Sequence, residues 1–67
     1  MQPVSSSNIA AVGYDADSLM VYVQFLNGST YAYKGVPEHE FENLRPAPSV
    51  GSYLNRNYKN VYPYERA

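Results

Sequence analysis

The sequence predicts an α+β domain in which a three-stranded antiparallel meander is followed by two short helices packed on one face of the sheet. β-Branched and aromatic residues dominate the first half of the chain, in runs separated by turn residues. Apolar residues three and four positions apart mark the second half as helical. With 67 residues the chain has room for a single two-layer domain, residues 1–67.

Three segments of the first half have the composition of strands. A polar lead-in over residues 1–8, with Pro3 and three serines, precedes the first of them. Asp and Ser residues predict a turn after the first strand, and Asn27-Gly28 predicts a hairpin after the second. The expected strands are Ile9–Tyr14, Leu19–Phe25 and Ser29–Lys34.

The length of the hairpin loop decides which way the tyrosines of the third strand point. A two-residue turn pairs Val23 with Ala32 and places Tyr31 and Tyr33 on the face away from the helices. A three-residue loop, Leu26–Gly28, pairs Val23 with Tyr31 and turns both tyrosines inward, because a one-residue slip reverses every side chain. We expect the three-residue loop, since three polar side chains then share the outer face: Gln24, Thr30 and Lys34.

The second half predicts two short helices and a tail. Pro37 is expected at the first helical position, where its missing N–H costs nothing, and Pro46 limits this helix. Ser49 is expected to cap the second helix. Its core stripe would be Val50, Tyr53, Leu54, Asn57, Tyr58 and Val61. The tail over residues 62–67 is too short and too broken by proline to predict an element of its own.

Composition excludes several classes of function. Without cysteine, the chain has no thiol chemistry and no thiolate zinc site, and its single histidine, His39, predicts neither a metal site nor a catalytic set. We therefore expect no enzyme activity, no metal and no cofactor. A net charge of −1 argues against gripping duplex DNA by bulk charge. The absence of a long apolar run or a signal pattern predicts a cytoplasmic protein that does not contact membranes.

A series of short motifs runs from Val4 to Arg66. The first half contains Ser6-Ser7-x-Ile9, Gly13-Tyr14-Asp15 and Val23-x-Phe25-x-x-Gly28-x-x-Tyr31-x-Tyr33-x-x-Val36-Pro37. The second half contains Ser49-x-Gly51-x-Tyr53-x-Asn55 and Tyr62-Pro63. These motifs resemble the KTSC domain, which is named after the C-terminal segment of some bacterial lysyl-tRNA synthetases.

The resemblance implies little about activity. KTSC domains also occur as small stand-alone proteins of bacteria and phages, and their function is not established. Their association with the synthetase has suggested RNA binding. The chain departs from the family pattern at positions 57–58, where Asn-Tyr stands in place of an apolar β-branched residue.

Aromatic residues on the sheet are the first candidate ligand-binding group. Tyr31 and Tyr33, on one face, have the spacing of a platform that stacks nucleobases. They are also expected as core residues beneath the helices in the preferred register, with their hydroxyls reaching a polar partner. Tyr22, on the opposite face, is then the better exposed candidate for stacking.

The start of the second helix is the second candidate site. Ser49, Gly51 and Ser52 are small residues at a helix N-terminus, where free N–H groups and the helix dipole attract anions. Ordinary capping beside a solvated helix face accounts for the same residues. A polar and basic stripe follows, formed by Ser52, Asn55, Arg56 and Lys59. The family motif adds Tyr53, and Lys34 is a further candidate for phosphate contact.

Two functions therefore remain open. The first is a non-enzymatic module that binds RNA or a nucleotide-like anion through the helix N-terminus and its basic flank. The alternative is protein–protein contact or self-association through apolar and aromatic surface. That surface would consist of Met20, Tyr22, Leu26 and Ala32 on the outer sheet face and the Tyr62-Pro63-Tyr64 tail.

Overall fold

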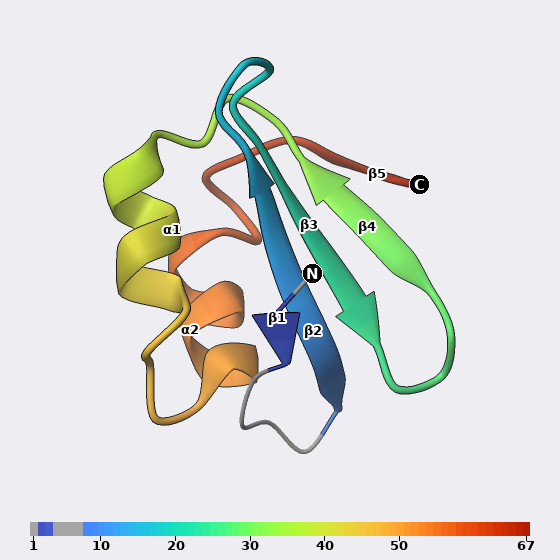
Figure 1. Ribbon diagram of the computed structural model, residues 1–67. Helices are drawn as coiled ribbons and strands as arrows, with labels where there is room; N and C mark the ends of the chain where they lie inside the picture. Colours follow the sequence, from blue (N-terminus) through green and yellow to red (C-terminus); the bar gives the residue numbers. More distant parts are fainter. Residues whose placement is uncertain (1, 4–7) are drawn as a thin grey trace.

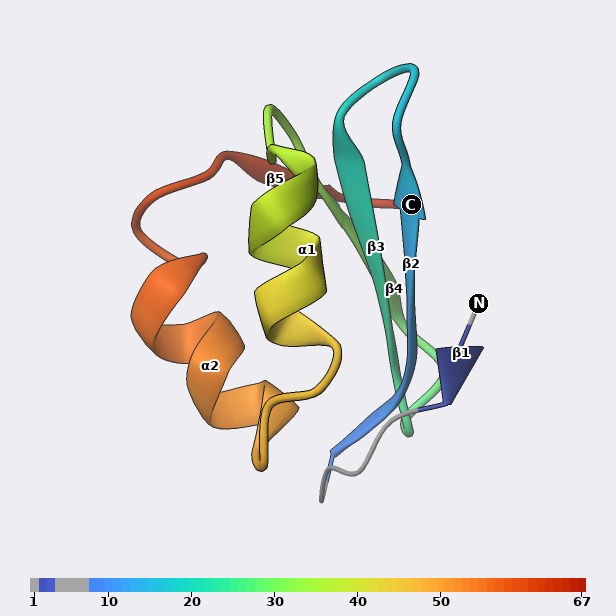
Figure 2. The same ribbon diagram turned by 60° about the vertical axis from the view of Figure 1, so that its left-hand side comes forward.

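A computed structural model describes residues 2–3 and 8–67 of the chain. One layer is an antiparallel sheet, and two helices cover one of its faces (Figures 1 and 2). The predicted α+β class with both helices on the same side is confirmed. Residues 4–7 of the expected lead-in, including Ser6-Ser7 of the family motif, lie outside the described residues.

The sheet has more strands than the sequence predicts. Its order is β1-β2-β3-β4-β5, with antiparallel pairing throughout. Four of these strands have three or more residues, and a two-residue strand lies at one edge. Their bounds are β1 Gln2–Pro3, β2 Ile9–Asp15, β3 Met20–Phe25, β4 Thr30–Tyr33 and β5 Tyr64–Arg66. The expectation of three strands, with the tail forming no element, is wrong.

Both missed strands are short edge strands. Neither Gln2–Pro3 nor Tyr64–Arg66 has the alternation of apolar and polar residues that marks a half-buried strand. Each instead completes hydrogen bonds that the neighbouring strand leaves open. For β5, the Lys34 N–H donates to Pro63 O at 2.8 Å and the Ala67 N–H donates to Thr30 O at 2.8 Å.

The three-residue loop between β3 and β4 is confirmed. Val23 pairs with Tyr31 and Val21 with Tyr33, so both tyrosines face the helices and the two-residue alternative is wrong. The Gly28 N–H donates to Phe25 O at 3.0 Å. Gly28 has φ +93°, in the left-handed region that favours glycine.

A β-bulge in β2 adjusts its apolar side chains to the same face. Ile9 pairs with Phe25 but Ala11 pairs with Gln24, so that one extra residue enters β2 between them. Without it, Ile9 and Val12 would point to opposite faces, because they are three positions apart. With it, both are fully buried under the helices.

Each helix departs from its prediction at one end. Helix α1, Glu38–Leu44, has Pro37 in the extended N-cap position, and not at the first helical position. Helix α2, Val50–Asn57, is capped by Ser49 as expected: the Ser52 N–H donates to Ser49 Oγ at 3.4 Å. The helix ends four residues before Val61, which is 62% exposed instead of in the core.

The core lies between the two layers. The Lys59 N–H donates to Leu54 O at 3.1 Å, which closes the C-terminal turn of α2 and leaves Tyr58 fully buried against the sheet. Asn57, the polar member of the expected stripe, is exposed. The buried core is Ile9, Val12, Val21, Val23, Tyr33, Val36, Phe41, Leu44, Val50, Leu54 and Tyr58.

Candidate functional site

A pocket of about 240 Å³ lies between α2 and the inner face of the sheet. Its sheet side comes from β2, β3, β4 and β5, and its helix side from α2 and the turn that follows α2. The lining residues are Asn8, Ile9, Phe25, Tyr31, Tyr33, Gly51, Leu54, Asn55, Lys59 and Tyr64. Five of the residues predicted as ligand-binding are among them: Tyr31, Tyr33, Gly51, Asn55 and Lys59.

The helix side of the pocket supplies its polar groups. Gly51 and Asn55 are one helical turn apart, and Lys59 follows one turn later. The side chains of Asn55 and Lys59 are exposed and form no hydrogen bond or ion pair within the described part of the chain. Both are therefore available to a ligand, one as an amide donor and acceptor and one as a cation.

The sheet side of the pocket is aromatic. Tyr31 is half-buried and meets Phe25 edge to face, with ring centroids 5.5 Å apart. On its other side it meets Tyr64 of β5 at 5.7 Å. Tyr64 in turn lies 5.2 Å from Tyr33. This row of rings is the aromatic wall: Phe25, Tyr31, Tyr64 and Tyr33.

Tyr33 belongs mainly to the core. It is 5% exposed, and burial raises the pKa of its hydroxyl, with smaller contributions from Tyr64 and Tyr31. Its ring is held by contacts to Tyr64 and Tyr58. The structure therefore favours the core interpretation for Tyr33, whereas Tyr31 keeps part of its ring at the pocket surface.

Only part of the N-terminus of α2 contributes to the pocket. Ser49 Oγ donates to Ser52 Oγ at 3.2 Å, in addition to accepting the capping bond from the Ser52 N–H. These two bonds agree with ordinary helix capping. Neither serine lines the pocket, and Tyr53 and Arg56 also lie outside the lining residues. The structure thus divides the predicted helix-terminal group, because Gly51 lines the pocket and the two serines do not.

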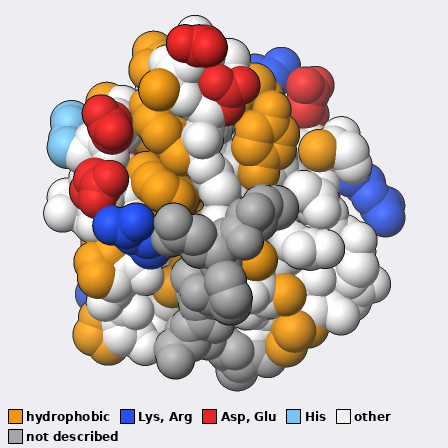
Figure 3. Space-filling model, in the orientation of Figure 1, with side chains coloured by type: hydrophobic (Ala, Val, Ile, Leu, Met, Phe, Trp, Pro, Cys, Tyr) orange, Lys and Arg blue, Asp and Glu red, His pale blue; other side chains and the backbone are white. Residues whose placement is uncertain are grey.

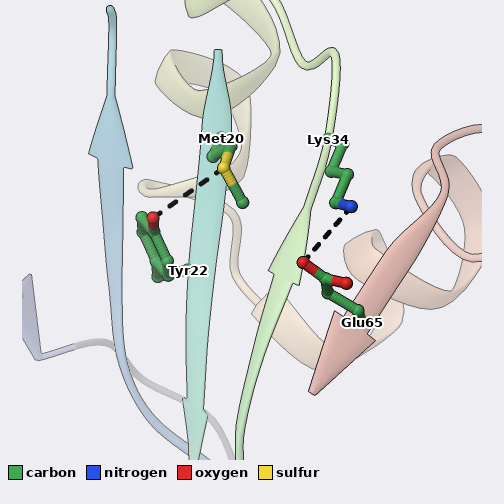
Figure 4. Close-up of polar contacts among 4 residues, drawn as sticks. All are labelled: Met20, Tyr22, Lys34 and Glu65. Atoms are coloured by element: carbon green, nitrogen blue, oxygen red, sulfur yellow. Dashed lines mark hydrogen bonds and ion pairs between the residues drawn. The ribbon is translucent and has the colours of Figure 1, made fainter. Parts of the chain in front are cut away.

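Tyr22 and Lys34 lie on the outer face of the sheet, away from the pocket (Figure 4). The Tyr22 hydroxyl is 3.8 Å from Met20 Sδ, and Lys34 Nζ is 3.2 Å from Glu65 Oε1. Lys34 is therefore already paired with a carboxylate. Ala32, expected as part of an exposed face, is 2% exposed, because it lies between the paired residues Tyr22 and Glu65.

Sequence reasoning missed the part of the pocket that depends on β5. Tyr64 enters the site only because the tail pairs with β4, and Phe25 because its ring meets Tyr31. No local pattern around Pro63 indicates that pairing. Asn8 and Ile9 line the pocket through the bulged start of β2.

Charge is divided unevenly between the parts of the chain. Acidic side chains gather at the top and upper left of Figure 3, where α1 and the β2–β3 turn lie. From residue 50 onward there are three basic residues against a single acid. Of the described residues that line the 240 Å³ pocket, Lys59 alone carries a formal charge. That pocket therefore favours an anionic group.

A second hollow of about 440 Å³ has the opposite character. It lies between α1 and β2, and Glu38 and Glu42 are the charged residues among its described lining. Its wall includes the stacked rings of Tyr14 and Phe41, whose centroids are 5.3 Å apart. The Tyr14 hydroxyl donates to Val36 O at 2.8 Å. No group of three or more potential metal ligands occurs in the described residues.

Comparison with known proteins agrees with the fold and the motifs. The family model of the KTSC domain matches residues 5–62. The chain belongs to the KTSC domain family. Its fold closely resembles the crystal structure of a KTSC domain protein from Yersinia pestis, with a TM-score of 0.90 and 40% identity, covering 98% of this chain and 93% of that one.

Two further relatives are similar in size to this KTSC domain. A protein of Tsukamurella paurometabola is 44% identical over 55 residues, which are 82% of each chain. An uncharacterized protein of Stutzerimonas stutzeri is 32% identical over 56 residues, 84% of this chain and 79% of its own. In the described part of this KTSC domain, neither helix has the length and apolar content needed to cross a membrane.

Proposed function

We propose that this KTSC domain is a non-enzymatic binding module whose pocket holds one nucleotide, either free or as an unpaired residue of RNA. The observation that carries the proposal is the arrangement of the two pocket sides. The unpartnered side chains of Asn55 and Lys59 lie on one side, and the aromatic wall with Tyr31 and Tyr64 lies on the other.

The chemistry of the two sides matches the two parts of a nucleotide. Aromatic rings stack with any nucleobase, and such contacts stabilise single-stranded binding by about 1–3 kcal/mol per base. An amide such as Asn55 hydrogen-bonds base edges, and the Lys59 ammonium attracts phosphate. The volume of about 240 Å³ is below the range of roughly 300–1,000 Å³ for drug-sized ligands, which favours one base over a stacked pair.

The proposal modifies the expectation of an anion site at the helix N-terminus. Ser49 and Ser52 satisfy each other in the cap, so the proposed anion contact moves two turns along, to Lys59. Arg56 remains an exposed basic neighbour outside the pocket.

The test is an amide NMR titration of labelled protein with adenosine monophosphate, uridine monophosphate and a short single-stranded RNA. We expect saturable shifts at Gly51, Asn55 and Tyr31. Lys59→Ala should weaken binding, whereas Lys34→Ala, the matched change on the outer face, should not. A flat response to all three ligands at low salt would refute the proposal.

Protein contact through the outer sheet face is the second candidate function. The observation in its favour is the exposure of Leu26 (63%), which follows β3, with half-buried Met20 and Tyr22 on the same face. The Tyr62-Pro63-Tyr64 tail contributes less to that face, because Tyr64, although 50% exposed, lines the pocket on the inner side of the sheet and Tyr62 is half-buried. Sedimentation of the parent and of the Leu26→Ser variant tests this function. Self-association of the parent that is lost in the variant would support contact through the outer face. A monomeric parent would limit such contact to other proteins.

A further inference from the structure

Gly51 is an unusual residue for its place in the fold. It is the second residue of α2, and glycine favours the helical conformation less than alanine does. It is half-buried, and it lines the 240 Å³ pocket together with Leu54 and Asn55.

The backbone does not require a glycine at this position. The glycines with positive φ are Gly28 and Gly35, whereas Gly51 lies in regular α-helix, a conformation that any residue except proline readily adopts. What distinguishes Gly51 from alanine here is therefore the missing side chain. Side chains four residues apart lie on one helix face, so a side chain at position 51 would project to the same side as that of Asn55.

We infer that Gly51 determines the size of the ring that the pocket accepts, by leaving the α2 backbone uncovered opposite Tyr31. This inference rests on the proposed nucleotide site. The base would lie with its edge against the helix backbone at Gly51, while Asn55 and Lys59 contact its polar groups and the phosphate. A methyl group at position 51 would reduce the depth of the pocket, and the larger purine ring would lose more contact than a pyrimidine.

The experiment compares Gly51→Ala with the parent in NMR titrations with adenosine monophosphate and uridine monophosphate. We expect the affinity for adenosine monophosphate to fall roughly tenfold or more, the usual effect of one misplaced methyl group in a tight pocket. The affinity for uridine monophosphate should fall less. The melting temperature should be unchanged or higher, because alanine favours the helix.

Two variants serve as controls. Ser52→Ala places the same side chain at the next, exposed position outside the pocket and should bind both nucleotides like the parent. Phe25→Leu, combined with Gly51→Ala, makes room on the aromatic wall and should recover part of the lost affinity for adenosine monophosphate.

The outcomes separate this inference from the proposed function. If the parent binds neither nucleotide nor RNA, the proposed function fails. If the parent binds and Gly51→Ala binds both nucleotides equally well, the function stands and the role of Gly51 is overturned. A Gly51→Ala protein that does not fold would also overturn it, because glycine would then be needed by the fold instead of by the pocket.

Discussion

The ring of Tyr58 meets that of Tyr33 edge to face, with centroids 5.6 Å apart. Tyr58 directly follows α2, and Tyr33 ends β4, so the contact joins the two layers at the centre of the core. Tyr58 is fully buried, yet its hydroxyl has no hydrogen-bond partner in the described structure. A polar group has thus been taken out of water without compensation, which costs free energy.

Removing that hydroxyl should therefore not weaken the fold. We expect Tyr58→Phe to raise the free energy of unfolding by about 1 kcal/mol, because the ring contacts remain and an unsatisfied polar atom is lost. Urea denaturation measures the change. The matched control is Tyr14→Phe, which removes a hydroxyl that donates to Val36 O and should lower stability. Equal losses in both variants would contradict the prediction.

Buried tyrosines should make the protein sensitive to alkali. Burial, followed by the charge of Glu40 and neighbouring tyrosines, raises the pKa of Tyr58 well above its usual value near 10, and burial also raises that of Tyr33. The unfolded chain loses these protons first, so their contribution to stability is full below pH ~10 and is lost as pH rises above it.

Unfolding measured in urea at pH 8 and at several values above 10 tests this dependence. The parent should lose stability steadily above pH ~10, and Tyr58→Phe should lose less over the same range because it has one raised pKa fewer. Identical pH profiles for parent and variant would show that Tyr58 does not carry the effect.

Salt should distinguish Lys59 from Lys34 in RNA binding. For single strands, each phosphate contact adds about 0.7 to the slope of log affinity against log salt concentration. We expect Lys59→Ala to reduce that slope by about 0.7 and Lys34→Ala, whose ammonium already pairs with Glu65, to leave it unchanged. Fluorescence anisotropy of a labelled short RNA measures both slopes. A slope reduced by Lys34→Ala and unchanged by Lys59→Ala would place the phosphate on the outer face.

The β3–β4 loop should depend on Gly28 through its backbone alone. Its φ of +93° is strained for other residues, while an added Cβ would meet nothing within 4 Å. Gly28→Ala should therefore cost about 1–2 kcal/mol of unfolding free energy. Gly28→Asn should cost less, since asparagine tolerates the left-handed region better. Thermal or urea unfolding of both variants gives the order, and a costless Gly28→Ala would refute it.

The predictability of this fold follows the strength of local patterns. β3 is rich in β-branched and aromatic residues. The polar set of Gln24, Thr30 and Lys34 identifies the hairpin register, because a one-residue slip would turn Thr30 and Lys34 toward the helices. The bulge after Ile9 and the pairing of β5 have no such signature, since both depend on hydrogen bonds to distant residues. The apolar stripe predicts the second helix, but it does not show that the helix ends at Asn57.

The site was predictable on one side only. Helical spacing brings Gly51 and Asn55 to one face whatever covers them, and Lys59 follows one turn later. The opposite wall depends on Tyr64, which reaches Tyr31 only after the tail has paired with β4. Long-range pairing of a short, exposed strand is the step that local sequence patterns do not specify.

The aromatic wall also gives the molecule a built-in optical reporter. The chain has eight tyrosines and no tryptophan, so its ultraviolet emission comes from tyrosine alone. Tyr31, Tyr64, Tyr33 and Tyr58 form an unbroken series of ring contacts between 5.2 and 5.7 Å, across which excitation energy can pass. A molecule that quenches the ring nearest the pocket would dim the emission of the whole series, so that binding could be followed on the unlabelled protein.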